Sequence, residues 1–466
     1  MTNARPSLWG DDECRRAHEA TLAVLEDPGV DVQNPRAREL LARAGATIDG
    51  SRASIPARLV EEALASAPRS FAVNSRGGHE PLVMEEGNTY FGTGGDCLYT
   101  RDLDSGERRR ARLADVNALA VLSERLAAID FVMSMGLAED APPEAPELAE
   151  FAALLTGTRK PLIVDPICEP ETLAVLRRMA ALAGEPDSFI IYAMSTSPLT
   201  HAESALGRVM GCAELGIPLI YGAGACAGFT APASRSAMVV ESNAEVLSGL
   251  VINQLATAGA PFIYGATAPA LSMRTTCILY VAPESMAIQQ ALCDLGRFYD
   301  LPSWTIGGSS DSSTLDGQWA AEAADSLTLA ALAGSTLVHD LGYLESGLQS
   351  AHESIVFTDE LVGYVRAYVA GVPLDDLETV VTEIRAVGPG GDHLARAHTR
   401  KHYRDFWQPS LVDQWAHDHW IADGGKTLND RLTARARELR SQAPAFEPDP
   451  SLVEALDAIV SDALSA

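Results

Sequence analysis

The stretch FIIYAMSTSPLTHAESALGRVMGCAELGIPLIYG, residues 189–222, contains the structural unit that much of the chain repeats. It begins and ends with apolar runs rich in β-branched and aromatic residues, at 188–194 and 218–222. Between them, residues 201–215 have the pattern of an amphipathic helix. Strands that are apolar on both faces and alternate with helices are typical of a parallel sheet built from βαβ units.

The same alternation extends in both directions from this unit. Eight strand–helix units over about 280 residues predict an α/β protein with a closed (β/α)8 TIM barrel. An open doubly wound sheet is the alternative, but the count and the even spacing favour closure. The other strands are expected at 90–93, 131–136, 161–165, 261–266, 302–307 and 335–339, and the other helices at 113–128, 146–157, 170–184, 236–258, 283–299, 317–333 and 353–370.

Two flanks lie outside the predicted barrel. We expect a mostly helical N-terminal extension over residues 1–89, the barrel over 90–370, and a helical C-terminal extension over 371–466. The C-terminal flank is broken by a GPGG turn at 388–391.

Composition excludes several classes of function. The net charge of −28 disfavours binding to nucleic acid or to an anionic membrane surface. There is no apolar run of about 18 residues and no secretory signal pattern, so we expect a cytoplasmic protein. The seven cysteines are scattered and form no CxxC pair, which argues against a disulfide framework or a structural zinc site.

Barrel active sites lie at the carboxyl ends of the strands, which turns the strand assignment into a set of candidate residues. These ends carry glycines, small hydroxyls, a few aromatic rings and a few charges, a lining that suits a pocket orienting a ligand for an external reagent. The residues with functional side chains are Asp96, Tyr99, Asp165, Ser195, Thr196, Ser197, His201, Thr267, Met273, Arg274, Ser309, Ser310, Asp311, Asp316, His339, Asp340, Tyr343 and Glu345.

A dinucleotide-binding loop and a metal site are two alternatives at these strand ends. The glycine run at 222–228 superficially resembles a dinucleotide loop, but no helix starts at the glycines, so a flexible loop is favoured. A metal site could use His339, Asp340, His352 and Glu353. However, adjacent strand residues point to opposite faces, so His339 and Asp340 can both face inward only at a kink. We therefore expect no metal.

An ordered set of segments in these loops resembles the trimethylamine methyltransferase family. The match covers about residues 90–420, and the set is more specific than any one piece. The segments are RDLDSGERRRARLADVNALAVLSERLAAIDFV, TAPASRSAMVVESNAEVLSGLVINQLATAGAPFIYG, SMRTTCILYVAPE, SSDSSTLDGQWAAEAADS, LVHDLGYLESGLQSAHESIVFTDE and AVGPGGDHLARAHTRKHY.

The resemblance implies a barrel that presents a methylated amine to a separate corrinoid protein. Reduced Co(I) cobalamin on that partner attacks the methyl group, so the cofactor is not bound permanently by this chain. Founding members of the family carry pyrrolysine, and this chain contains none. A quaternary ammonium already has a neutral leaving group, so the resemblance implies a quaternary amine similar to glycine betaine as the substrate.

Residue roles follow from that substrate. A quaternary ammonium binds aromatic faces, and the candidates are Tyr99, Tyr221, Tyr264, Trp304, Trp319 and Tyr343, most of which could also simply pack the barrel. Arg274 and His339 are expected to hold a substrate carboxylate. We assign His339 and Asp311 as catalytic. The remaining substrate-binding candidates are Gln318, Asn243 and Glu345.

Other functions stay open from the sequence. A non-catalytic quaternary-amine binding protein would share the pocket but would not transfer methyl groups. A barrel lyase or an oxidoreductase would bind a metal or a nucleotide instead. The helical flanks are expected to shield the barrel, to form a homo-oligomer or to dock the corrinoid protein.

Overall fold

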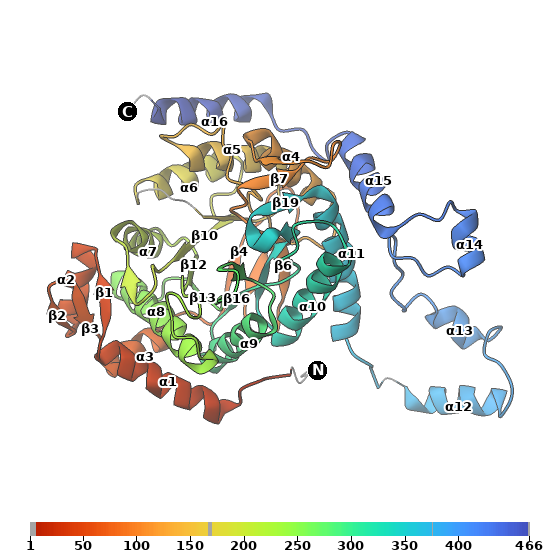
Figure 1. Cartoon of the computed structure of the whole chain (residues 1–466), viewed down its shortest axis with the longest axis horizontal. Coiled ribbons are helices and arrows are strands. Elements are labelled where there is room, and N and C mark those ends of the chain that lie inside the picture. Colours follow the sequence, from red (N-terminus) through yellow and green to blue (C-terminus); the bar gives the residue numbers. More distant parts are fainter. Residues whose placement is uncertain (1–5, 166–169, 375, 465–466) are drawn as a thin grey trace.

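The computed structural model describes residues 6–165, 170–374 and 376–464. Within these residues, seven parallel strands form one curled sheet in the order β6-β17-β16-β13-β12-β10-β9 (Figure 1). The strands are β6 (Tyr90–Thr93), β9 (Leu162–Val164), β10 (Phe189–Met194), β12 (Leu219–Gly222), β13 (Phe262–Gly265), β16 (Ser303–Ile306) and β17 (Leu337–Leu341).

The gap between the edge strands β6 and β9 is bridged by the segment expected as a strand at 131–136. Phe131 forms a parallel bridge with Gly92 of β6, and Val132 forms one with Leu162 of β9. The predicted α/β barrel is therefore confirmed, with its eighth segment reduced to two bridging residues.

The helices that alternate with these strands begin and end within a few residues of the expected bounds. They surround the sheet, and their apolar faces cover the outward side chains of the strands. They are α4 (Leu113–Arg125), α5 (Pro146–Gly157), α6 (Thr172–Leu182), α7 (Glu203–Leu215), α8 (Arg235–Ala256), α9 (Pro283–Phe298), α10 (Gly317–Ala333) and α11 (His352–Val369).

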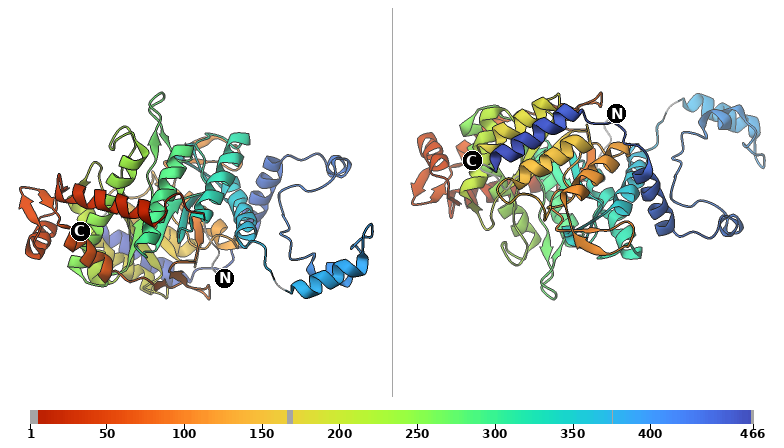
Figure 2. Two further views of the ribbon diagram at one scale, coloured as in Figure 1. Left: turned by 90° about the horizontal axis from the view of Figure 1, so that it is seen from below. Right: turned by 90° about the horizontal axis from the view of Figure 1, so that it is seen from above.

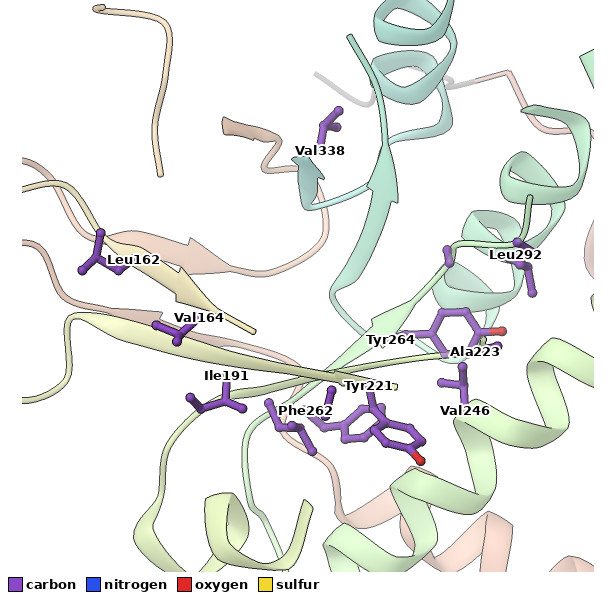
Figure 3. Close-up of a cluster of buried hydrophobic side chains, with 14 of the residues drawn as sticks. Leu162, Val164, Ile191, Tyr221, Ala223, Val246, Phe262, Tyr264, Leu292 and Val338 are labelled. Carbon is purple, nitrogen blue, oxygen red and sulfur yellow. The ribbon is translucent and has the colours of Figure 1, made fainter. Parts of the chain in front are cut away.

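Side chains alternate along each strand between the barrel interior and the surrounding helices. Residues such as Ile191, Tyr221 and Tyr264 face outward and pack against the helices (Figure 3). Their neighbours form a separate interior cluster, which includes Phe131, Met133, Ile163, Ile190, Ile220, Ile263, Trp304 and Leu337.

The segment before β6 contains short strands as well as the expected helices. Val73, Leu82 and Met84 of the hairpin β4–β5 join the interior cluster, so this hairpin packs against the inward side chains of the barrel. The elements are α1 (Asp11–Glu26), β1 (Val30–Val32), α2 (Pro35–Ala44), β2 (Thr47–Asp49), β3 (Arg52–Ser54), α3 (Ala57–Ser66), β4 (Phe71–Val73) and β5 (Leu82–Met84).

Short strands also decorate the loops of the barrel. β1 pairs with β11 (Thr200–His201), and β14 (Ala270–Leu271) pairs with β15 (Ile278–Leu279) in a hairpin. A second small sheet combines β7 (Tyr99–Arg101), β8 (Arg108–Arg110), β18 (Tyr343–Leu344) and β19 (Gln349–Ala351).

The chain after α11 first leaves the barrel and then returns to it. α12 (Leu377–Val387), α13 (Ala397–His402) and α14 (His417–Ala422) stand away from the body (Figure 2). α15 (Leu428–Ser441) and α16 (Pro450–Ala463) pack back onto the barrel helices. No helix in the described ranges is long and apolar enough to cross a membrane.

A buried hydrogen-bond network attaches α1 to the barrel. The Asn243 side chain on α8 donates to the Thr21 hydroxyl of α1 at 2.9 Å and to the Tyr299 hydroxyl at 2.8 Å. It also accepts from the Tyr264 hydroxyl at 2.8 Å. Asn243 and Tyr264 were expected to bind substrate, but neither faces the barrel interior. Tyr264 directly follows the inward-facing Ile263 on β13 and therefore points outward, and Asn243 lies on the surrounding helix α8.

We expect Asn243→Ala to destabilise the fold, because it leaves the buried Tyr264 hydroxyl without its acceptor. A buried polar group that loses its partner costs about 1–3 kcal/mol. Urea unfolding followed by tryptophan fluorescence measures the loss. The control is Gln318→Ala, an exposed change expected to cost less than about 0.5 kcal/mol. Equal free energies of unfolding for Asn243→Ala and wild type would contradict this account.

Candidate active site

A cavity of about 260 Å³ opens at the carboxyl ends of the barrel strands. Its lining combines carboxylates, aromatic rings, one imidazole and apolar side chains, a mixture typical of a small-molecule site. The acidic and aromatic members are Asp96, Asp165, Asp340, Tyr192, Tyr280, Trp304 and His339, and the apolar members include Met133, Met194, Ile278 and Ile306.

The strand period explains why these residues meet. Asp165, Tyr192 and His339 each lie two positions after a residue of the interior cluster, so they point inward in the next layer. In the same layer, β12 and β13 contribute only Gly222 and Gly265. A Cβ on Gly265 would lie 2.5 Å from the Cα of Gly222, so glycine is required there by the close approach of the β12 backbone.

His339 and Asp340 both line the cavity although they are adjacent on β17. This arrangement depends on a kink, because the β17–β6 register shifts between Val338 and Leu341 and Asp340 adopts a left-handed φ of +67°. A non-glycine residue in this region costs about 1–3 kcal/mol. The kink brings the Asp340 carboxylate to 2.7 Å from Nδ1 of His339.

The His339 ring stacks on the indole of Trp304, with centroids 3.7 Å apart and planes 8° from parallel. With Nδ1 held by Asp340, the other ring nitrogen, Nε2, has no hydrogen-bond partner within the described residues. His339 is only 6% exposed. The ring is thus fixed in orientation while one polar atom remains available to a ligand in the cavity.

Asp96 is held by Tyr343, which lies behind the lining. The backbone N–H of Asp96 donates to the Tyr343 hydroxyl at 2.8 Å, and that hydroxyl donates to the Asp96 carboxylate at 3.0 Å. Burial raises the pKa of Asp96, and the negative charge of Asp340 raises it further. Asp340 is therefore close enough to disfavour the ionised form of Asp96.

Asp165 lines the cavity and is exposed to it. Burial raises the pKa of this carboxyl to about 7, and the charge of Asp96 adds to the rise while that of Arg208 opposes it. A cation in the cavity would favour the ionised form of Asp165.

Asp311 supports the loop that carries Tyr280. Its carboxylate accepts from the backbone N–H groups of Tyr280 at 2.9 Å and Val281 at 3.3 Å, and from the Ser346 hydroxyl at 2.8 Å. Asp311 was expected to be catalytic; in the structure it is outside the lining and positions an aromatic ring that is inside it.

The other predicted site residues are dispersed. The Arg108 guanidinium lies over the Tyr99 ring, with its Cζ atom 3.3 Å from the ring centroid. The same guanidinium pairs with Glu345. Gln318 is exposed and donates to Glu322 at 2.9 Å. Arg274 is exposed on the β14–β15 hairpin. Of the twelve residues that were given roles, Trp304 and His339 line the cavity directly, and Tyr343 contacts a lining residue.

Sequence reasoning missed Tyr192 and Tyr280 and did not assign Asp96, Asp165 and Asp340 to the substrate site. The signal for Tyr192 was present, because it is two residues after Ile190 in a clear strand. No comparable signal existed for Tyr280, which reaches the cavity from a hairpin after β13.

The alternative sites suggested by the sequence look different in three dimensions. Gly224, Ala225 and Cys226 of the glycine run line the cavity, and α8 begins only at Arg235. His352 and Glu353 lie at the start of α11 and are not among the lining residues. No group of three or more His, Cys, Asp or Glu side chains in the described ranges is arranged to hold a metal ion.

The family model for trimethylamine methyltransferase matches residues 2–463. The chain belongs to the trimethylamine methyltransferase family. This membership confirms the prediction of a methyltransferase.

Relatives in this family cover almost the whole chain. The chain is 30% identical to glycine betaine methyltransferase of Desulfitobacterium hafniense, over 95% of this chain and 94% of that protein. It is 28% identical to a trimethylamine methyltransferase of the same species, over 95% of this chain and 90% of that protein. A trimethylamine methyltransferase of Methanosarcina mazei is 29% identical, over 98% and 95% of the two chains.

The fold is similar to that of a solved methyltransferase. The monomethylamine methyltransferase of Methanosarcina barkeri superposes with a TM-score of 0.52 over 93% of this chain and 88% of that chain, at 10% identity. At this identity the likeness concerns the barrel architecture alone.

The raised pKa of Asp165 predicts a pH-dependent cost to folding. Between its usual value of 3.8 and about 7, the folded protein holds a proton that the unfolded chain has released, so stability falls as pH rises through this window. Asp165→Asn removes this loss. We expect the variant to gain more stability over wild type at pH 8 than at pH 5 in urea unfolding. The exposed Asp325→Asn serves as control and should show no such pH-dependent gain.

Proposed function

We propose that this enzyme takes a methyl group from a quaternary ammonium compound and passes it to the cobalt of a separate corrinoid protein. The observation that carries the proposal is the lining of the cavity, in which aromatic faces and carboxylates surround one space. Family membership supports the reaction class, and two relatives are named for the methylated amines glycine betaine and trimethylamine.

The lining has the chemistry that a permanently charged, methylated nitrogen requires. Such a group cannot donate a hydrogen bond, so it is bound by aromatic faces, at about 0.5–2 kcal/mol for each ring, and by negative charge. Tyr192 and Trp304 lie at the cavity with ring centroids 5.6 Å apart, and Tyr280 lines it from the hairpin. Burial raises the pKa of both tyrosines, which keeps the phenols neutral.

Among the described lining residues, none is an obvious methyl acceptor. The Cys226 thiol lines the cavity, but burial raises its pKa, so the reactive thiolate is scarce near neutral pH. The reduced corrinoid supplies the nucleophile when its protein is docked. An external acceptor needs an approach to the donor, and the lining residues Met194 and Ile278 remain solvent-exposed.

The protein's own contribution is binding and orientation. The demethylated amine leaves as a neutral base, so the departing nitrogen needs no proton from the enzyme during bond cleavage. The stacked His339 ring and the Asp96 and Asp340 carboxylates hold the cation in one orientation. Holding reactants in an attack geometry is itself a large source of rate enhancement. Glycine betaine is one member of the proposed donor class.

The direct test mixes the purified protein with chemically reduced cobalamin or a corrinoid protein and a panel of methylated amines. We expect at least one quaternary amine to convert the Co(I) absorbance to that of the methylated cofactor. The panel contains betaines, carnitine, choline and trimethylamine. Failure with every donor and both acceptors would contradict the proposed reaction.

His339 gives a second test of the same site. We expect His339→Ala to lower kcat by at least about 100-fold, because it removes the Nε2 atom and the stacked ring from the cavity. The fold should persist, as checked by circular dichroism and unfolding. The exposed Gln318→Ala variant should keep the wild-type rate. Turnover near the wild-type value in His339→Ala would remove this residue from the site.

A further inference from the structure

The charge of the cavity is asymmetric. Three carboxylates, those of Asp96, Asp165 and Asp340, line it. The described lining residues include no lysine or arginine. We infer that the preferred donor is a quaternary ammonium cation without a carboxylate of its own, such as choline, and that glycine betaine is a poor donor for this chain. The inference rests on the proposed function and narrows its substrate class.

Two observations mark this acidic group as a ligand site. The first is the set of aromatic rings that shares the cavity with it, which gives a cation a second kind of contact. The second is His339, which is more than nine-tenths buried, lines the cavity and leaves Nε2 without a partner in the described residues. The carboxylates therefore share one pocket with aromatic rings and with a buried polar atom that has no partner in the described residues.

Negative charges within this group of carboxylates also raise the pKa of two of its members. Burial and the charge of Asp340 raise the pKa of Asp96, and burial and the charge of Asp96 raise the pKa of Asp165. A cation placed among them relieves this repulsion. A second anion would increase it, since like charges in a partly desolvated space repel strongly.

Cationic side chains near the site have other partners or lie outside the lining. Arg108 binds Glu345 and Arg109 binds Asp115, both in charge-assisted pairs. The positive charge of Arg208 on α7 lowers the pKa of Asp165. Arg274, which the sequence suggested as the carboxylate partner, is exposed on the β14–β15 hairpin and is not a lining residue. A donor carboxylate would therefore have to enter the cavity without a matching cation.

The hydroxyl groups of the lining can also hydrogen-bond a neutral polar substituent of the donor. Tyr192 and Tyr280 keep neutral phenols because burial raises their pKa, and Thr267 adds a further hydroxyl to the lining. Hydroxyl groups both donate and accept hydrogen bonds, so they pair well with the hydroxyl of choline.

The test compares donors that share a trimethylammonium head and differ in charge. Choline and the methyl ester of glycine betaine are neutral beyond the nitrogen, whereas glycine betaine carries a carboxylate. We expect kcat/KM for choline and the ester to exceed that for glycine betaine at least tenfold in the cobalamin assay. A value for glycine betaine equal to or above the others would overturn the inference and leave the proposed reaction intact.

Charge-neutral variants examine the cause of the preference. Asp96→Asn and Asp165→Asn should each reduce the choline-to-betaine ratio of kcat/KM at least threefold. Asp325→Asn, on the exposed face of α10, should leave the ratio unchanged. A ratio that does not change in either site variant would show that these carboxylates do not set the donor, which also overturns the inference.

Binding without any corrinoid separates the inference from the proposed function. Calorimetric titration of the full chain with choline and with glycine betaine measures the preference directly. Tighter binding of choline supports the inference even if no donor methylates cobalamin, in which case only the methyl transfer fails. Tighter binding of glycine betaine, or no binding of either compound, overturns it.

Discussion

Inside the barrel, side chains from neighbouring strands meet in layers, and a residue two positions further along its strand lies in the next layer. The deeper layer is apolar, with Ile163, Ile190, Ile220 and Ile263 in one cluster. The next layer contains Asp165, Tyr192 and His339, together with Gly222 and Gly265. The apolar layer and the β4–β5 hairpin fill the barrel interior, whereas the polar side chains of the next layer line the cavity.

Groups in the cavity keep their positions through contacts outside it. Tyr343 holds Asp96, and Asp311 holds the backbone of Tyr280. The left-handed backbone conformation of Asp340 is energetically unfavourable. It occurs where the adjacent residues His339 and Asp340 both face the cavity. Strain concentrated at such a point is common in functional sites. These contacts fix the positions of Asp96 and of the Tyr280 backbone.

The barrel and the lining carry different information about function. The barrel is shared with a monomethylamine methyltransferase at only 10% identity, so architecture alone does not determine the donor. We propose that the aromatic rings of the cavity bind a methylated cation and that its carboxylates discriminate among such cations by charge. We propose that a separate protein supplies the methyl acceptor. Such a pocket needs an opening to solvent and no nucleophile among its own side chains.

The sequence by itself determined the barrel, because apolar strands and amphipathic helices alternate at a regular spacing along the chain. The strand expected at 188–194 is observed at Phe189–Met194, and the family was recognisable from its loop segments. The short strands before β6 were missed because they are not part of this regular alternation. His339 and Trp304 were expected in the site and line the cavity, and their roles stay predictions.

Only the tertiary structure decided which of the other candidates face the ligand space. Tyr264 points behind β13 because one position along a strand reverses the direction of a side chain, and its hydroxyl donates there to Asn243 of α8. Asp340 faces inward at a kink that no local sequence pattern predicts. Tyr280 follows a hairpin, and its backbone N–H donates a hydrogen bond to Asp311. Such placements depend on contacts between segments far apart in the chain, so they cannot be obtained from the spacing of residues along it.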